Sequence, residues 1–475
     1  MRVLMQMRSR SAVGSGVART VTAVAPSFGM TAAGLDVGLV IDPTFAPVPL
    51  AAPVAPEPGA SRFAFMQPMR FSDAPEDETY LVRGELAEGD PAVVHALLAH
   101  PDVVGVFSDP TVETTITCAT TPAVGTDRDV ARLLGVSQLG RAGYTGRGVL
   151  VAIVDTGINR PHLVAHGRTQ TVDTAKSWTP AGVPTTPGNH PVDHGTMCAY
   201  DVGIAAPKAT LLDYSALLTR RGGETTMSGL LSDAVAGYAR LLQLLRATPL
   251  ARRRMVVTNS WGMFSPEWDF PVGHPGNFSD NPRHPFNIIV ASLENAGADI
   301  LFAAGNCGLD CPDGRCGFGT TRPICGANSH PRVLCVGGID TAKKRVGYSS
   351  QGPGRLSAKK PDIATYTHFA GSGVYPYDGG TSAACPVAAG VVAAIRTKHS
   401  AGELSPAQLR TLIAKTAEDL SGVGFDYDVG WGAVSPQALI KALERRKRPP
   451  ARTSPKPRRK ASAASSARAP RKARS

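Results

Sequence analysis

The sequence contains no stretch of about 18 uninterrupted apolar residues, the length that a helix needs to cross a bilayer. A membrane-spanning helix is therefore not expected. Only 8 of the 475 residues are cysteine, too few for a scaffold held together mainly by disulfides. Hydrophobic residues make up 43% of the chain, which excludes a wholly disordered protein.

Acidic residues are absent from residues 445–475, which contain 13 Lys or Arg. The formal net charge of the chain is +12, so residues 1–444 carry only −1, and a basic nucleic-acid-binding body is excluded. The composition of the tail predicts disorder. Because the tail also lacks aromatic residues, any binding to nucleic acid or to an anionic surface would be nonspecific and salt-dependent. A solvated tail without a partner is an equally good interpretation.

Residues 1–77 are rich in Ala, Val, Gly and Pro, and predict an irregular or extended region. The first ten residues are basic, as in a secretory signal, but Arg19 interrupts the weakly apolar stretch that follows, so the signal is absent or atypical. Residues 78–118 predict a small α+β unit, in which strands TYLVRGEL and VVGVFSD flank the helix PAVVHALLAH. Residues 119–139 have the Thr-rich composition of a linker.

Residues 140–444 alternate apolar strands with helices, a rhythm typical of an α/β fold with a parallel β-sheet flanked by helices on both faces. Helices are expected in SGLLSDAVAGYARLLQLLR, in FNIIVASLENAGA, and in SPAQLRTLIAKTAE with Ser405 as its cap. The predicted strands are residues 149–155, 209–217, 254–261, 299–305 and 332–339.

Polar residues follow two of these strands, at the edge of a parallel sheet where ligands bind. Asp155 ends the strand VLVAIVD, and Asn306 follows the strand DILFAAG. Ser382 begins a helix after the glycine-rich turn DGGTS. A polar residue at such a position is as often a turn or cap residue as a functional one, but the joint occurrence of the three indicates an active site.

The fourth candidate is His194, which competes with three nearby histidines. His194 is favoured because HGT begins a helix of small residues that is suited to close packing behind an active site. The helix that begins near Ser382 has the same kind of composition. The competing residues are His162, His166 and His190.

Three motifs together resemble those of the subtilisin-like serine proteases. VAIVDTGIN surrounds Asp155, HGTMCA surrounds His194 and GGTSAACPVAAG surrounds Ser382, in the order Asp, His, Ser that this family uses. TNSWG at residues 258–262 resembles the segment that lines the substrate cleft, and FAAGN places Asn306 at the oxyanion asparagine. The resemblance covers about residues 140–443.

The resemblance implies a serine endopeptidase with the catalytic triad Asp155, His194 and Ser382, an Asn306-assisted oxyanion hole and an acyl-enzyme intermediate. It implies protein or peptide substrates that pair with the backbone of Ser260, Trp261, Gly262, Ala304 and Gly305. Met197 and Ala383 stand where the family commonly has His and Met, positions that do not perform the chemistry.

The unit at residues 78–118 resembles a propeptide, which implies a zymogen that is cut between residues 111 and 141. A permanent extra subdomain is the alternative interpretation.

Three other functions are less well supported. An α/β-hydrolase needs G-x-S-x-G, whereas this turn is GTSAA, without the last glycine. Cys385 as a nucleophile would lie three residues into the helix and face away from the Ser382 side chain, so it is expected to be a buried packing residue. A binding-only relative is disfavoured because all four catalytic positions are intact.

Five cysteines lie between residues 307 and 335. Four of them could bind zinc, but the CxxC pairs of structural zinc sites are absent, and disulfides are favoured, with their pairing left open. Cys335 is expected to be buried in a strand. The four clustered cysteines are Cys307, Cys311, Cys316 and Cys325.

The chemistry requires no cofactor and no metal ion. The sequence contains no recognisable calcium-binding loop, although it does not exclude a structural calcium ion. Disulfides favour a secreted or cell-envelope location, but without a clear signal peptide the location stays open. The oligomeric state is not determined by the sequence.

Overall fold

The computed structural model describes residues 1–8, 39–51, 78–86, 91–100, 102–114, 122–218, 227–317 and 321–447. The larger part of the chain is built on a seven-stranded sheet with the order β15-β14-β13-β11-β7-β9-β8. Every neighbouring pair is parallel, which confirms the predicted sheet. The strands are β7 (Leu150–Val154), β8 (Thr171–Val172), β9 (Thr210–Tyr214), β11 (Met255–Asn259), β13 (Ala298–Ala303), β14 (Leu334–Ile339) and β15 (Ile363–Tyr366).

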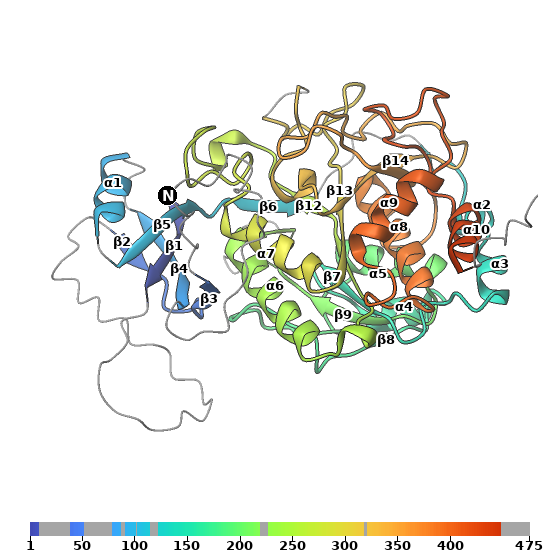
Figure 1. The fold of residues 1–475 in the computed structure, drawn as a ribbon, viewed down its shortest axis with the longest axis horizontal. Helices are drawn as coiled ribbons and strands as arrows, with labels where there is room; N and C mark the ends of the chain where they lie inside the picture. The colour runs from blue at the N-terminus through green and yellow to red at the C-terminus, as the bar shows by residue number, and fades with distance from the viewer. Residues whose placement is uncertain are drawn as a thin grey trace, which may run out of the picture.

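Helices cover both faces of this sheet, as predicted (Figure 1). Along β7, Val151 and Ile153 belong to one hydrophobic core and Ala152 and Val154 to the other, because successive side chains of a strand point to opposite faces. The first core also contains residues of α5 (His194–Ala205) and α8 (Gly380–Arg396), and the second contains residues of α6 (Leu231–Arg246) and α7 (Pro285–Asn295).

The remaining helices lie around this framework. Ser405 caps one of them as predicted, since its side chain accepts a hydrogen bond from the Gln408 backbone N–H. These helices are α2 (Asp127–Leu133), α3 (Val136–Arg141), α4 (Arg160–Ala165), α9 (Pro406–Thr416) and α10 (Pro436–Lys447). Short 3₁₀ turns occur at Leu250–Arg252, Pro266–Trp268 and Gly326–Ser329.

The two small-residue helices α5 and α8, whose composition suits close packing, pack against each other. Gly390 makes this approach possible, because a Cβ at that position would lie 2.5 Å from the Val202 carbonyl oxygen of α5. α8 is buried along its whole length. The helix that begins with His194 and the helix that contains Ser382 therefore lie side by side against one face of the sheet.

A second, antiparallel sheet forms the N-terminal unit, with the order β2-β4-β1-β5 and β3 paired to β4. Its helix α1 was predicted, and so were β4 and β5. The elements are β1 (Arg2–Arg8), β2 (Leu39–Ile41), β3 (Val48–Ala51), β4 (Glu78–Leu86), α1 (Pro91–Ala99) and β5 (Val103–Ser108).

The sequence predicts an irregular or extended region at residues 1–77, and β1, β2 and β3 are extended segments of that region that pair into this sheet. β1 is an inner strand, paired with β4 on one side and β5 on the other, and its Val3, Met5 and Met7 side chains are buried. Its partners lie more than 70 residues away, so the strand is stabilised by pairing that local composition does not reveal. The rest of that region lies outside the described residues.

The N-terminal unit contacts the larger domain through buried polar groups. Arg83 forms ion pairs with Asp42 at 2.7 Å and with Asp233 of α6 at 3.1 Å. Asp109 accepts hydrogen bonds from the backbone N–H and from Oγ of Ser232, both at 2.8 Å. β6 (Thr111–Thr114) then runs from this unit onto the larger domain (Figure 1).

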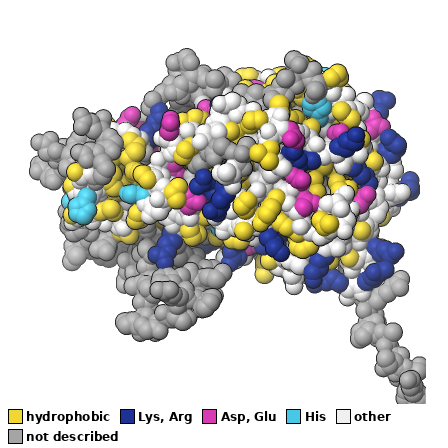
Figure 2. All heavy atoms as spheres, turned by 90° about the horizontal axis from the view of Figure 1, so that it is seen from above, with side chains coloured by type: hydrophobic (Ala, Val, Ile, Leu, Met, Phe, Trp, Pro, Cys, Tyr) yellow, Lys and Arg dark blue, Asp and Glu magenta, His cyan; other side chains and the backbone are white. Residues whose placement is uncertain are grey.

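The described chain ends in α10, which continues through Lys447. Residues 445–447 of the predicted tail are therefore helical, and the buried Leu439 and Leu443 side chains anchor this helix. The remainder of the tail, and with it any binding by the tail, lies outside the described residues. None of the described helices is both long and apolar enough to cross a membrane. On the face shown in Figure 2, acidic and basic side chains are interspersed.

Candidate active site

Asp155 and His194 meet at the carboxyl end of β7. Asp155 directly follows this strand, and His194 is the first residue of α5, capped by the Asp193 side chain. His194 Nδ1 lies 2.8 Å from Asp155 Oδ1, and both side chains are buried. A carboxylate can only accept, so Nδ1 carries the proton and Nε2 is the basic nitrogen. His194 Nε2 is buried without a hydrogen-bond partner among the described residues.

Glycine and threonine in the two motifs hold this pair together. The Gly195 backbone N–H donates to Thr156 Oγ1 at 2.9 Å. A Cβ on Gly195 would lie 2.5 Å from the Gly157 carbonyl oxygen, so no larger residue fits between the end of β7 and the start of α5. The local sequences DTG and HG are therefore required by the close approach of the two segments.

Ser382 lies in the first turn of α8, near the same place. Its Oγ donates to the Ser260 carbonyl oxygen at 3.3 Å, and Ser260 Oγ donates back to the Ser382 carbonyl oxygen at 3.0 Å. Cys198 Sγ lies 3.6 Å from the Ser382 carbonyl oxygen and 3.8 Å from His194 Nδ1. The serine and the histidine thus share one buried neighbour, which the sequence analysis did not identify.

Asn306 follows β13 and is tied to the residue before Ser382. Its Oδ1 accepts hydrogen bonds from the Thr381 backbone N–H at 2.9 Å and from Thr381 Oγ1 at 3.1 Å. The Asn306 side chain is fully buried. These contacts fix the orientation of the carboxamide relative to the first turn of α8.

The segment predicted to line the cleft is the edge of a small antiparallel sheet. β6 lies between β10 (Ser228–Leu230) and β12 (Trp261–Gly262). In this sheet Thr114 is opposite Trp261 and Glu113 is opposite Gly262. A strand from the N-terminal unit therefore occupies the position that sequence analysis assigned to substrate.

Three of the predicted cleft residues also have internal partners. The Trp261 side chain is buried and its Nε1 donates to the Val154 carbonyl oxygen at 2.9 Å, so only its backbone is available for pairing. The Ala304 N–H donates to Val336 at 2.9 Å, and the Gly305 N–H donates to Thr381 Oγ1 at 3.0 Å. Within the described residues, Ala304 and Gly305 lie just beyond the end of β13, and no segment occupies a substrate-like position beside them as β6 does beside β12.

The competing histidines have other partners. His190 lies 2.6 Å from Thr185 Oγ1, and burial lowers its pKa to about 4. His162 Nε2 lies 2.9 Å from the Ser372 carbonyl oxygen, and His166 stacks on the His162 ring. His194 is the one of the four that contacts Asp155.

The clustered cysteines are partly disulfide-bonded. Cys307 is bonded to Cys316, and Cys311 is also in a disulfide, which confirms the disulfide prediction for these three and excludes them as zinc ligands. The prediction is wrong for Cys325, a free thiol that is buried in the core with its Sγ 3.5 Å from the Met263 carbonyl oxygen. Cys335 is buried in β14 as expected.

The buried thiols near the site are protonated. Burial raises the pKa of Cys385 to about 12, and burial and the nearby Asp155 carboxylate raise that of Cys198 well above its usual range. Cys385 is therefore a packing residue and not a nucleophile. In the described part of the chain, the side chains close enough to share a metal ion are Asp155, His194 and Cys198.

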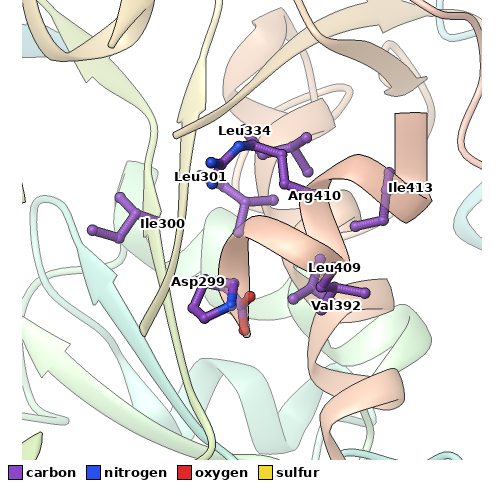
Figure 3. A pocket seen from close by; sticks show the side chains of 9 residues that line it. Asp299, Ile300, Leu301, Leu334, Val392, Leu409, Arg410 and Ile413 are labelled. Atoms are coloured by element: carbon purple, nitrogen blue, oxygen red, sulfur yellow. The ribbon is translucent and has the colours of Figure 1, made fainter. Parts of the chain in front are cut away.

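A small crevice lies elsewhere, between the sheet and helices α8 and α9 (Figure 3). None of the predicted site residues lines it. Its walls are mostly apolar and include Leu301, Leu334, Val392, Leu409 and Ile413.

Comparisons with known proteins identify the family of this chain. Residues 146–432 match the model of the subtilase family. A subtilisin of Bacillus pumilus is 26% identical over 315 residues, which cover 65% of this chain and 98% of that protein. The membrane-bound transcription factor site-1 protease of Mus musculus is 28% identical over 338 residues, 67% of this chain and 27% of that protein.

A similar solved structure is that of fervidolysin from Fervidobacterium pennivorans, with a TM-score of 0.51 and 18% identity. The match covers 76% of this chain and 56% of that one, and shows a shared fold. The family match extends over more than half of the chain and includes Asp155, His194, Asn306 and Ser382. The chain therefore belongs to the subtilase family and is a subtilisin-like serine endopeptidase.

Proposed function

We propose that this endopeptidase cleaves peptide bonds with Asp155, His194 and Ser382 as its catalytic triad. The observation that carries the proposal is the 2.8 Å contact between His194 Nδ1 and Asp155 Oδ1, with Nε2 left without a partner among the described residues. This is the protonation pattern that a general base needs, because the acceptor nitrogen is available to a serine hydroxyl.

In the proposed reaction Ser382 Oγ attacks the carbonyl carbon of the substrate while His194 Nε2 takes the hydroxyl proton. Asp155 stabilises the imidazolium that forms and keeps its orientation. His194 then returns the proton to the leaving amine as the C–N bond breaks, which leaves an acyl group on Ser382. Water, activated by the same imidazole, hydrolyses this ester and restores the hydroxyl.

Asn306 is proposed to stabilise the negative charge that develops on the carbonyl oxygen. Its Oδ1 is engaged by Thr381, so the Nδ2 amide is the half of the side chain that can donate to the oxyanion, together with a backbone N–H near Ser382. No metal ion or cofactor has a step in this mechanism.

Substrate is proposed to bind as an extended strand between β10 and β12. The support is β6, which pairs antiparallel with both strands at this place. Main-chain pairing of this kind binds extended peptides with little regard to their sequence.

A fluorophosphonate probe tests the triad, because it labels only an activated serine. We expect the parent protein to be labelled and Ser382→Ala to be unlabelled. Cys385→Ala is the matched control, since it removes a buried side chain three residues further along the same helix and should retain labelling. Labelling of Ser382→Ala at the parent level would refute the assignment.

We further infer that the N-terminal unit is a propeptide and the chain a zymogen. The support is that β6 fills the proposed substrate position, with Asp109 and Arg83 anchoring the same unit on α6. A peptide in that position blocks the cleft until it is cut. The register of β6 favours a cut just beyond Thr114, within the interval 111–141 expected from the sequence.

Intact-mass analysis distinguishes a propeptide from a permanent subdomain. Self-processing predicts a shortened parent protein and a full-length Ser382→Ala protein. Identical full-length masses would instead support a permanent N-terminal subdomain.

The disulfide between Cys307 and Cys316 supports a location in an oxidising compartment, and we infer that the protein is secreted or held in the cell envelope. Detection of the protein only in the reducing cell interior, with this pair reduced, would contradict the inference.

A further inference from the structure

The strand in the cleft carries an acidic side chain that meets a cation. Glu113 of β6 accepts a hydrogen bond from Arg315 Nη1 through its Oε2. Arg315 Nη2 also donates to the Thr114 carbonyl oxygen at 2.7 Å. One guanidinium thus binds both a side chain and the backbone of the strand, and the proposed catalytic steps do not use this contact.

Arg315 is held in place by residues of its own domain. Its Nε and Nη2 donate to Asp313 at 3.1 and 2.8 Å, and its guanidinium carbon lies 4.4 Å from the centre of the Phe264 ring. Asp313 is buried, so the edge of the guanidinium group that carries Nε and Nη2 is held in place. The contacts direct Nη1 toward Glu113, and a preorganised cation loses little entropy on binding an acid.

The loop that carries Arg315 is anchored at the proposed oxyanion residue. It begins directly after Asn306 and is closed by the Cys307–Cys316 disulfide. The Asp313 backbone N–H donates to the Asn306 carbonyl oxygen at 2.8 Å, and the Gly317 N–H donates to Phe264 at 2.8 Å. Arg315 therefore has a defined position relative to both the oxyanion residue and the segment after β12.

The strand register relates Arg315 to the bond that is cut. Glu113 is opposite Gly262 and Thr114 is opposite Trp261, so the next residue of any strand bound in this register faces Ser260. Ser382 Oγ lies 3.3 Å from the Ser260 carbonyl oxygen. The residue that faces Ser260 is thus the one presented to the nucleophile, and Arg315 contacts the side chain two residues before it.

We propose that Arg315 is a specificity-determining residue that selects substrates with Asp or Glu two residues before the residue whose carbonyl is attacked. The inference rests on the proposed function, because it takes the β6 position as the substrate position. The Glu113–Arg315 pair is partly exposed, with 18% and 26% of the two side chains accessible, and Asp313 already balances the arginine charge. The expected preference is therefore moderate, about tenfold.

Matched peptides test this preference. Two internally quenched peptides have the sequence of residues 110–119 of this chain, with Ser replacing Cys118 and either Glu or Gln at the position of Glu113. We expect kcat/KM of the parent enzyme to be about tenfold higher for the Glu peptide. Arg315→Gln should bring the two values within about twofold by slowing only the Glu peptide, and Arg315→Lys should keep part of the preference because it retains the charge without the fork.

Arg345→Gln is the matched control. Arg345 pairs with Asp310 of the same disulfide-closed loop, and its other hydrogen bonds go to backbone carbonyls within residues 346–349. This variant should retain the preference for Glu, and an equal loss would show that overall charge is responsible and overturn the proposal. Equal rates for the Glu and Gln peptides with the parent enzyme would overturn it directly, even if Arg315→Gln fails to fold.

Fluorophosphonate labelling distinguishes a failure of the Arg315 proposal from a failure of the proposed catalytic triad. A parent protein that is labelled and cleaves both peptides equally contradicts only the role of Arg315. A parent protein whose N-terminal unit has been removed, and that is still neither labelled nor active, contradicts the proposed triad itself.

Discussion

The substitution Asp155→Asn isolates the charge of the proposed triad from its geometry. Asp155 Oδ1 accepts from His194 Nδ1 and from the Thr156 backbone N–H, both at 2.8 Å. Because both neighbours donate to this position, the amide oxygen of the substituted side chain is expected to occupy it. The imidazole then keeps its tautomer and orientation, and only the negative charge is lost.

The magnitude follows from the 2.8 Å separation between His194 Nδ1 and Asp155 Oδ1. At this distance and an effective dielectric constant of about 20, two unit charges attract by about 6 kcal/mol. The imidazolium charge is shared between two nitrogens, so the loss in transition-state stabilisation is about 3 to 6 kcal/mol. Each 1.4 kcal/mol is about tenfold in rate, which predicts a fall in kcat of about 10² to 10⁴.

The assay is kcat for a fluorogenic peptide. If the N-terminal unit is a propeptide as proposed, slow variants would not remove it themselves, so each variant is first treated with a trace of tagged parent enzyme that is then removed. Asp193→Asn is the matched control, because the Asp193 carboxylate contacts the His194 backbone N–H and the Tyr375 hydroxyl, and the amide oxygen can accept both hydrogen bonds. It should change kcat by less than about threefold. A kcat of Asp155→Asn within tenfold of the parent would refute the electrostatic argument.

Three further predictions concern oxyanion stabilisation, a buried ion pair and acid stability. Asn306→Ala should lower kcat by about 10² to 10³ with little change in KM, a magnitude known for the equivalent donor in subtilisin. Asp299→Ala should lower the free energy of unfolding by about 3 to 5 kcal/mol, measured by urea unfolding in a Ser382→Ala background, because it leaves the fully buried Arg396 without its 2.7 Å partner. Burial and neighbouring cations lower the pKa of His330 from 6.5 to about 3. As the pH falls, His330 is therefore protonated in the unfolded chain before it is protonated in the folded one. The stabilisation that is present above pH 6.5 is lost as the pH falls toward 3. Between pH 7 and 5 the loss is about 2 kcal/mol, and His330→Gln should remove that part of the pH dependence in the same urea assay.

Each of these predictions has its own contrary outcome. An Asn306→Ala enzyme within tenfold of the parent kcat would show that the amide is not an oxyanion donor. Glu418→Ala is the control for Asp299→Ala, because it removes the partner of Lys343 in an exposed ion pair and should lower the free energy of unfolding by less than about 1 kcal/mol. An equally small decrease for Asp299→Ala would contradict the argument from the buried pair. An unchanged slope of stability against pH in His330→Gln would assign the acid sensitivity to other groups.

The elements that carry the chemistry could be predicted because their signals are local. Strands such as β7 are short apolar runs between turns, and the polar residues at the ends of strands and helices follow from backbone geometry. Asp155 therefore comes directly after a strand and His194 begins a helix, as the sequence indicated.

The errors occur where the outcome depends on distant partners. β1 is an inner strand through pairing with β4 and β5, which local composition does not show, and Cys325 is a reduced thiol in an apolar environment. Composition and spacing carry no information about which distant surface will cover a segment.

The sequence by itself determined at which ends of strands and helices the candidate residues for hydrolysis lie, because periodicity and turn chemistry act over a few residues. Only the tertiary structure decided which residues that are distant in the sequence contact each other. Examples are Asp155 with His194, Cys307 with Cys316, and Glu113 with Arg315. Such contacts depend on sheet register and on the packing of helices against the sheet, which fix the positions of residues far apart in the chain only once the whole core has formed.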